Sequence, residues 1–334
     1  MYKISSNYSV QLNKNIDSVG TVNSGDVFEV ETINAYGDNF KNLNELMDLI
    51  SGKYSDKHHH PLTGPIDING TVPGDVLKVE IKNIKMNIMA QALSQSAGIS
   101  PIKIDNFGDR APIIANYDKN NNDIYYMNGI HIDYKPMIGV IGTAPNEGFI
   151  KTGHAGKTGG NLDIPFVEIG NVIYLPVKTE GGKLFLGDCH GNQGYGELGG
   201  IALEASANLR IKVDVLKPRY NFDSIVIIGK EPMTKENAIG IVGIANSFQN
   251  LSEAVVDAYN NAINVLVPMF PTLNKHYICN LITAIGHSMN GQAFSKTSES
   301  TSIINILEKD IRKIKNNTGF DLACEFEKAW FKKA

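Results

Sequence analysis

Alternating hydrophobic and polar residues predict two strands in the first quarter of the chain. Residues 25–33, GDVFEVETI, place Val30 and Thr32 on one face and two glutamates, including Glu31, on the other. Residues 75–84, DVLKVEIKNI, alternate more regularly, with an aliphatic side chain at every second position. This second pattern is typical of an antiparallel strand that packs on a core with one face and meets water with the other.

Glycine-containing turns separate further short apolar runs in the middle of the chain. Asn128-Gly129 is a strong hairpin signal, because both central positions of the turn favour positive φ. Gly170-Asn171 and Gly181-Gly182 predict two more hairpins. The strands predicted in this region cover residues 124–127, 130–134, 166–169, 172–177, 183–188, 209–216 and 222–229. The expected fold class is therefore α+β and predominantly β, with an antiparallel β-sandwich body.

Helical spacing of apolar residues replaces the strand pattern in the last quarter of the chain. The helices predicted there cover residues 252–268, 275–291, 302–317 and 324–333. Ser252 is the expected N-cap of the first, and Gly291 is the expected end of the second. We therefore divide the chain into a β-rich catalytic body, residues 1–245, and a helical C-terminal part, residues 246–334, packed on it.

Composition and charge narrow the class of protein. The 334 residues are 42% hydrophobic and 20% charged, which is typical of a globular protein and excludes a disordered chain. Thirty-one basic and 35 acidic residues give a net charge of −4, so we expect no nucleic-acid partner and no anionic membrane surface. The chain has no signal-peptide core near its start and no run of ~18 apolar residues, which predicts a cytoplasmic location.

The densest group of reactive side chains lies in residues 186–206, LGDCHGNQGYGELGGIALEAS. Asp188 and His190 are two positions apart at the end of a predicted strand, so both project to one face. Glu197 and Glu204 follow within a glycine-rich stretch, and carboxylates with an imidazole are donors that Zn²⁺ accepts. The alternative is structural, with His190 bonded inside a tight turn and Asp188 capping a backbone amide.

Two other features carry candidate chemistry. Residues 151–165 form a glycine-rich stretch with Asp163 but without a P-loop arrangement, which favours a metal or substrate loop over a phosphate site, with a plain hairpin connection as the alternative. His58, His59 and His60 precede a proline, and alternate members could bind a metal or merely decorate the surface.

Cysteine chemistry is not favoured. The chain has three cysteines without a CxxC pair, which argues against a disulfide scaffold and a cysteine-rich zinc module. Cys189 would point away from both of its neighbours in a strand, so we expect a small buried hydrophobe rather than a nucleophile.

Several blocks occur in a fixed order between about residue 23 and residue 215. They are SGDVFEVETINAYG at 24–37, HPLTGPIDINGTVPGDVLKVEIKNI at 60–84, GVIGTAP at 139–145, TGGNLD at 158–163 and GNVIYLPVKTEGGKLFLGDCHGNQGYGELGGIALE at 170–204. The last block contains G-D-x-H-x-x-Q-G-x-G-E with a trailing glutamate. Together they resemble the acetamidase/formamidase family.

The resemblance implies hydrolysis of a short-chain amide to a carboxylic acid and ammonia, with a divalent metal on a β-sandwich-rich fold. Zinc is the expected ion and calcium the alternative. The candidate residues are the metal ligands Asp163, Asp188 and His190, the catalytic residues Glu31, His59 and Glu204, of which Glu204 is also a candidate ligand, and the substrate-loop residues Gln193, Glu197 and His60. Two features depart from the family pattern, because His60 replaces a frequent tryptophan or asparagine and the segment after Met289 has no counterpart.

Two other classes of function stay open at this point. One is a non-catalytic, metal-containing β-sandwich protein that binds a small ligand, and the other is a thiol amidase that uses Cys189. A metal-dependent amidohydrolase with a small-molecule amide substrate is the leading hypothesis. The apolar C-terminal helices carry no obvious solubilising charge, which predicts a homodimer.

Overall fold

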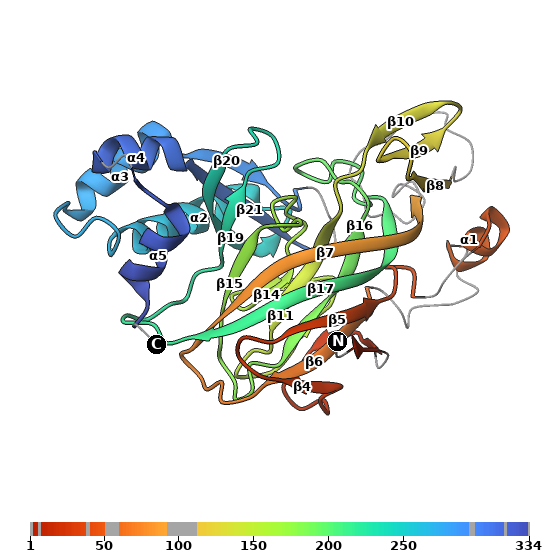
Figure 1. Cartoon of the computed structure of the whole chain (residues 1–334), viewed down its shortest axis with the longest axis horizontal. Coiled ribbons are helices and arrows are strands. Elements are labelled where there is room, and N and C mark those ends of the chain that lie inside the picture. The colour runs from red at the N-terminus through yellow and green to blue at the C-terminus, as the bar shows by residue number, and fades with distance from the viewer. Residues whose placement is uncertain are drawn as a thin grey trace.

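The computed structural model describes residues 3–5, 8–37, 41–50, 60–91, 112–293, 298–316 and 319–332. Within these ranges the chain forms a large curled sheet, mostly antiparallel, and helices that gather mainly in the C-terminal part (Figure 1). The predicted fold class, predominantly β with a sandwich body and C-terminal helices, is confirmed.

The elements follow one another in this order along the chain. The strands are β1 (Lys3–Ile4), β2 (Tyr8–Ser9), β3 (Gln11–Leu12), β4 (Gly20–Val22), β5 (Val27–Thr32), β6 (Leu62–Ile68), β7 (Val76–Gln91), β8 (Ile113–Asp118), β9 (Asp123–Met127), β10 (Ile130–Asp133), β11 (Met137–Thr143), β12 (Ile150–Lys151), β13 (Ala155–Gly156), β14 (Gly159–Asn161), β15 (Val172–Pro176), β16 (Leu184–His190), β17 (Glu204–Leu216), β18 (Val226–Lys230), β19 (Asn237–Phe248), β20 (His287–Asn290) and β21 (Glu299–Leu307). The helices are α1 (Leu43–Ile50), α2 (Leu251–Leu266), α3 (Lys275–Ile285), α4 (Glu308–Lys315) and α5 (Leu322–Trp330).

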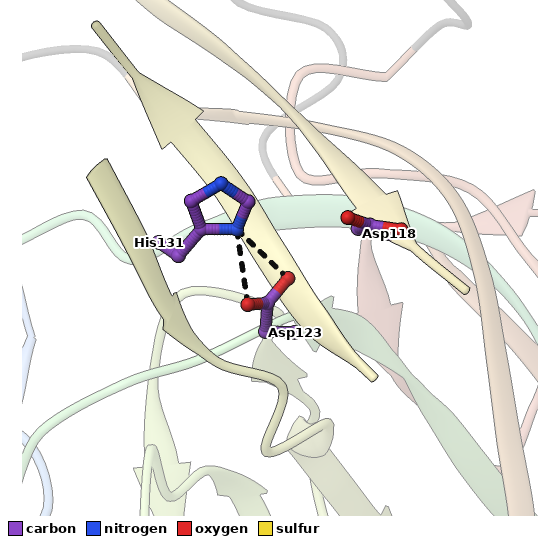
Figure 2. A group of neighbouring side chains, drawn as sticks. All are labelled: Asp118, Asp123 and His131. Atoms are coloured by element: carbon purple, nitrogen blue, oxygen red, sulfur yellow. Dashed lines mark hydrogen bonds and ion pairs between the residues drawn. The ribbon is translucent and has the colours of Figure 1, made fainter. Parts of the chain in front are cut away.

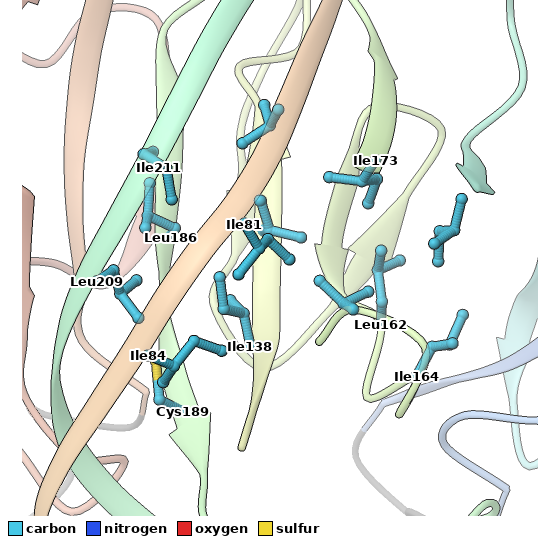
Figure 3. Close-up of a cluster of buried hydrophobic side chains, with 14 of the residues drawn as sticks. Ile81, Ile84, Ile138, Leu162, Ile164, Ile173, Leu186, Cys189, Leu209 and Ile211 are labelled. Atoms are coloured by element: carbon cyan, nitrogen blue, oxygen red, sulfur yellow. The ribbon is translucent and has the colours of Figure 1, made fainter. Parts of the chain in front are cut away.

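Two runs of paired strands form the two layers of the sandwich. One run passes from β5 through β17, β7, β15, β18, β19 and β21 to β20. The other passes from β4 through β6, β16, β11 and β14 to β13. Side chains from both runs meet in one buried core, where Leu186 and Ile138 of the second run lie near Leu209 and Ile211 of the first (Figure 3). The layers join where the end of β16 pairs with the start of β17.

A second core lies on the outer face of the first run, under the helices. Successive residues of β18 face opposite ways, so that Ile227 enters the sandwich core and Ile228 enters the second core. Ala258 and Ala262 of α2 pack there, and the absent side chain of Gly243 lets the backbone of α2 approach β19 closely. Helices α2–α5 therefore cover one face of the sheet at the side opposite to the β8–β10 ribbon (Figure 1).

The period-two predictions are confirmed. Phe28, Val30 and Thr32 of β5 are buried, and so are Leu77 and Val79 of β7. The Asn128-Gly129 turn joins β9 to β10, with φ values of 48° and 80° at its two residues. Alternation therefore predicted which side chains of β5 and β7 are buried, and the turn residues predicted the pairing of β9 with β10.

The other two predicted hairpins are wrong. Residues 166–169 contribute only an isolated bridge between Glu168 and Met137. β15 pairs with β7 and β18, whereas β16 pairs with β6, β11 and β17. The turn at Gly181-Gly182 thus connects the two layers of the sandwich rather than two neighbouring strands.

The helix predictions are confirmed in part. The N-cap of α2 lies two residues earlier than expected, because Asn250 rather than Ser252 accepts the capping hydrogen bond from the Glu253 N–H. α3 ends at Ile285 and not at Gly291, and β20 follows it. The first half of residues 302–317 is strand β21, whose residues are almost all buried, so an apolar run without alternation was mistaken for a helix.

The boundary that we predicted after residue 245 falls inside β19. The part from residue 246 onwards contributes β20 and β21 to the sheet in addition to four helices in the described ranges. Among the helices described, none combines the length and apolar character needed to span a bilayer.

Candidate active site

Five buried titratable side chains meet where the two layers of the sandwich join. Asp188 and His190 end β16, and Glu204 begins β17 directly opposite His190. Asp163 follows β14, and Glu197 lies in the glycine-rich connection between β16 and β17. Each of the five is at most 7% exposed. Since buried ionisable groups are costly unless they are paired or bind a metal, their convergence marks a functional site.

The backbone around this cluster is held in an unusual conformation. Asp163, Asp188, Glu197 and His60 all have φ between 41° and 51°, in the left-handed region that side chains other than glycine rarely adopt. Each such residue costs about 1–3 kcal/mol, and the surrounding structure must supply it. Strain concentrated at four residues of one cluster is typical of an active site rather than of a structural turn.

Gln193, which follows His190 in the glycine-rich connection after β16, orients the His190 ring. Gln193 donates through Nε2 to the Asp163 carbonyl oxygen at 2.6 Å, so its Oε1 is the atom that lies 2.7 Å from His190 Nδ1. His190 Nδ1–H therefore donates to Gln193. The other ring nitrogen, Nε2, faces Asp188 Oδ1 at 3.5 Å and Glu204 Oε2 at 3.3 Å. A histidine held in this way presents its second nitrogen as a ligand.

Four polar atoms of the cluster have no hydrogen-bond partner in the part of the chain that the structure describes. They are Asp163 Oδ1, Asp188 Oδ1, His190 Nε2 and Glu204 Oε2. Donor atoms of Asp188, His190 and Glu204 lie within 4.8 Å of one another, and so do those of Asp163, His190 and Glu197. A buried polar group without a partner costs about 1–3 kcal/mol. Three carboxylate oxygens and one imidazole nitrogen are a donor set that fits a divalent cation such as zinc.

Crowding displaces the pKa values of the carboxyl groups. Burial, followed by the charge of Asp188, raises the pKa of Asp163 to about 7. Burial and the charge of Asp163 raise the pKa of Glu197 well above its ordinary value, and burial likewise raises the pKa of Glu204. Although burial acts in the opposite direction, the imidazoles of His60 and His190 hold the pKa of Asp188 well below its usual range. The excess of acidic groups must be neutralised by protons or by a cation.

His60 lies on the solvent side of the cluster. Its Nδ1 is 3.0 Å from Asp188 Oδ2, and its side chain is 31% exposed whereas that of Asp188 is 1% exposed. Burial alone would lower the pKa of His60, but the Asp188 carboxylate raises it to about 9. The predicted substrate-loop residue is thus in direct contact with a predicted metal ligand.

Gln292 belongs to the cluster, although the sequence analysis did not identify it. Its Nε2 donates to Glu197 Oε2 and lies 3.4 Å from Asp163 Oδ2. Gln292 is 95 residues from Glu197 along the chain, and an isolated bridge between Gly196 and Gln292 brings the two backbone segments together. No local pattern in the sequence could have indicated this contact.

Glu31, which was predicted to be catalytic, is not part of the buried cluster. Glu31 is 37% exposed, and its carboxylate pairs with Lys3 Nζ at 2.5 Å. Glu31 lies on the face of β5 opposite to the buried Val30 and Thr32, so its side chain points away from the core. His59 lies outside the described residues.

Cys189 points away from its two neighbours, as the strand period predicted. Its side chain is completely buried in the sandwich core (Figure 3), and Sγ lies 3.6 Å from Thr32 Oγ1. Burial raises the pKa of the Cys189 thiol to about 12. Because the thiolate is the nucleophile, this environment does not favour a thiol amidase.

A separate group of Asp118, Asp123 and His131 lies on the β8–β10 ribbon (Figure 2). His131 Nδ1 is 3.0 Å from both carboxylate oxygens of Asp123, across the β9–β10 pair. Asp118 instead accepts hydrogen bonds from Asn120 and Asn121 of its own turn. This partly exposed cross-strand pair is typical of a stabilised hairpin, not of a metal centre.

Comparison with known proteins agrees with this geometry. A model of the acetamidase/formamidase family matches residues 6–155 and 146–290. Two curated relatives, one from Schizosaccharomyces pombe and the formamidase of Methylophilus methylotrophus, are 25% and 24% identical over 258 and 257 residues. These matches cover 59% and 60% of this chain and 61% of each relative, so the chain spans less than two thirds of their length.

Solved structures of similar fold cover nearly the whole chain. The acetamidase of Bacillus halodurans has a TM-score of 0.79 and 24% identity, over 93% of this chain and 99% of that one. A Thermoanaerobacter tengcongensis protein described as a predicted acetamidase/formamidase has a TM-score of 0.78 and 26% identity, over 94% and 98%. Both structural similarities extend over the sandwich and the C-terminal helices.

Proposed function

Because the chain belongs to the acetamidase/formamidase family, we propose that it hydrolyses a short-chain amide, formamide- or acetamide-like, to a carboxylic acid and ammonia. The observation that carries this proposal is that His190 Nε2 and three buried carboxylate oxygens have no hydrogen-bond partner in the described part of the chain, while His190 belongs to both groups of close donor atoms. A structural role for Asp188 and His190 alone would have left these atoms bonded to the backbone. The cluster is therefore proposed as the site where the amide is cleaved.

Asp163, Asp188, His190 and Glu204 are proposed to hold one divalent cation. The imidazole in the set favours zinc over calcium, since calcium takes six to eight oxygen ligands. When bound, zinc would polarise the amide carbonyl and lower the pKa of water, which is the chemistry that an unreactive amide requires. Glu204 thereby takes the ligand role, one of the two that the resemblance implies for it.

Glu197 is proposed to carry the proton. In the reaction the oxygen of water bonds to the amide carbon, the C–N bond breaks, and the nitrogen leaves as ammonia after gaining a proton. A carboxyl group that takes the proton from water and returns it to the nitrogen must have a pKa near the working pH. Glu197 is buried beside Asp163, which raises its pKa in the required direction. Glu31, which the resemblance implies as a catalytic residue, is exposed and paired with Lys3.

The other residues orient these groups and border the site. Gln193 holds Nδ1–H of His190 and so keeps Nε2 turned toward the carboxylates. His60, a third exposed and in contact with Asp188, is proposed to border the entrance for the substrate. The cytoplasmic location and the homodimer stay predictions from the sequence.

Ammonia release from a panel of amides tests the proposal. We expect product from formamide or acetamide, loss of product after chelation, and recovery when zinc is restored. Ligand-induced thermal stabilisation without product from any amide would instead indicate a binding protein and defeat the proposal. Full turnover in rigorously metal-free protein would defeat the part that concerns the cation.

A further inference from the structure

A segment that follows the family match holds two loops of the site together. The match ends at residue 290. Beyond it, Ala293 N–H donates to the Gly196 carbonyl at 3.3 Å, next to Glu197, while Gly196 N–H donates to the Asn290 carbonyl at 2.7 Å. Thr301 Oγ1 donates to the Leu162 carbonyl at 2.7 Å, next to Asp163. Residues 290–293 and Thr301 therefore contact both loops that present a carboxylate to the cluster.

Gln292 is the residue of this segment whose side chain enters the site. It is 3% exposed, and its backbone is fixed, because its N–H donates to Thr301 Oγ1 at 2.7 Å and its carbonyl accepts from Thr301 N–H at 2.9 Å. With the backbone held in this way, the side-chain amide has a defined position. Its Nε2 reaches one oxygen of Glu197 and lies 3.4 Å from one oxygen of Asp163.

The chemistry of an amide suits this position. The NH₂ group has two donors and no charge, so it can satisfy two carboxylate oxygens without adding to the buried charge. In the reversed amide orientation Oε1 would face the same oxygens and could accept only from a protonated carboxyl group, whereas NH₂ can also donate to a carboxylate. A methionine of similar length would fill the space but offer no donor, and a buried carboxyl left without its partner would lose its fixed orientation.

We propose that Gln292 is a positioning residue whose amide group holds the Glu197 carboxyl group beside Asp163 and His190. A residue beyond the family match thereby completes the site. The effect on turnover rests on the proposed function of Glu197, whereas the contact itself does not. The segment after Met289, for which the sequence offered no counterpart, thus has a role in this chain.

The test compares Gln292→Met with the wild type and with Asn171→Ala, a matched loss of a buried amide elsewhere. Asn171 donates to the carbonyls of Phe166 and Lys230 and does not contact the cluster. We expect Gln292→Met to lower kcat by about 10- to 100-fold, with a smaller change in KM and with zinc stoichiometry retained. Asn171→Ala should lower the melting temperature while kcat of the folded protein stays near that of the wild type.

A double-mutant comparison distinguishes positioning from general loosening of the fold. If Gln292 acts through Glu197, Gln292→Met should cause almost no further loss of kcat in a Glu197→Gln background. Losses that multiply in the double mutant, or a Gln292→Met enzyme with wild-type kcat, would overturn the proposal. If Gln292→Met does not fold, Gln292→Asn withdraws the amide by one methylene and is judged by the same measurements.

Failure of the proposed function is recognised separately. If the wild type releases ammonia from no amide, crystal structures of the wild type and of Gln292→Met decide the question without activity. We expect the Glu197 carboxyl group to move or to lose its single orientation in the variant. An unchanged Glu197 would overturn the proposal.

Discussion

Gly139 offers the smallest substitution that tests the geometry of the site. It lies in β11, and a Cβ built at this position would lie 2.7 Å from Asp163 Oδ1, 2.7 Å from the Asp188 carbonyl oxygen and 2.8 Å from His190 Cε1. Ordinary van der Waals contact begins at 3.4 Å. Gly139→Ala would therefore push on three groups of the cluster, each by about 0.6–0.7 Å.

The expected effect on the site is larger than the effect on stability. Gly139 is not among the glycines with positive φ, so alanine is allowed there and gains about 0.4–1 kcal/mol through the unfolded chain. Overpacking costs about 1–3 kcal/mol, which leaves a modest net destabilisation. Ligand distances, by contrast, must hold within about 0.2 Å, so the displacement is several times the tolerance. We expect zinc affinity to fall by about 100-fold or more.

Zinc affinity is measured by competition with a chromophoric chelator, together with ammonia release and thermal melting. Gly199→Ala is the matched control, because no heavy atom lies within 4 Å of a Cβ built there and its φ is not positive. The control should keep zinc, turnover and melting temperature. A Gly139→Ala protein that binds zinc and hydrolyses amide like the wild type would refute the close packing of the site on β11.

Three further predictions concern individual groups. Glu197→Gln should lower kcat by about 10²- to 10⁴-fold with zinc retained, whereas the exposed Glu31→Gln should stay near wild type in the same assay; the reverse result would return the proton-carrying role to Glu31. His190→Ala should lose zinc and turnover together, and stoichiometric zinc by metal analysis of this variant would mean that the donor set is misassigned. In metal-free protein the free energy of unfolding should fall between about pH 5 and pH 9, as followed by denaturant titration. The sign follows because burial, followed by the charge of Asp188, raises the folded-state pKa of Asp163 from 3.8 to about 7. Burial lowers the pKa of His60, but the Asp188 carboxylate outweighs it and raises this pKa from 6.5 to about 9, so the folded state binds more protons throughout. Stability that increases over this range would contradict these two pKa shifts.

Local sequence patterns determined those parts of the protein in which the interacting residues are close along the chain. The alternation in β5 and β7 predicted which side chains are buried, because a strand with one covered face must alternate. The Asn128-Gly129 turn was enough to predict the hairpin of β9 and β10. Asp188 and His190 could be assigned to one face from their spacing alone, since strand geometry has a period of two.

The tertiary structure decided what depends on contacts between distant segments. β21 is buried on both faces, so its sequence lacks the alternation that separates strand from helix, and its pairing with β19 and β20 makes it a strand. Asp163 and Gln292 reach Glu197 from separate loops, and no spacing relates the three. Glu31 and Glu197 are chemically the same side chain. The first meets water and a lysine, and the second is enclosed among carboxylates, so packing alone determines which of them has a perturbed pKa.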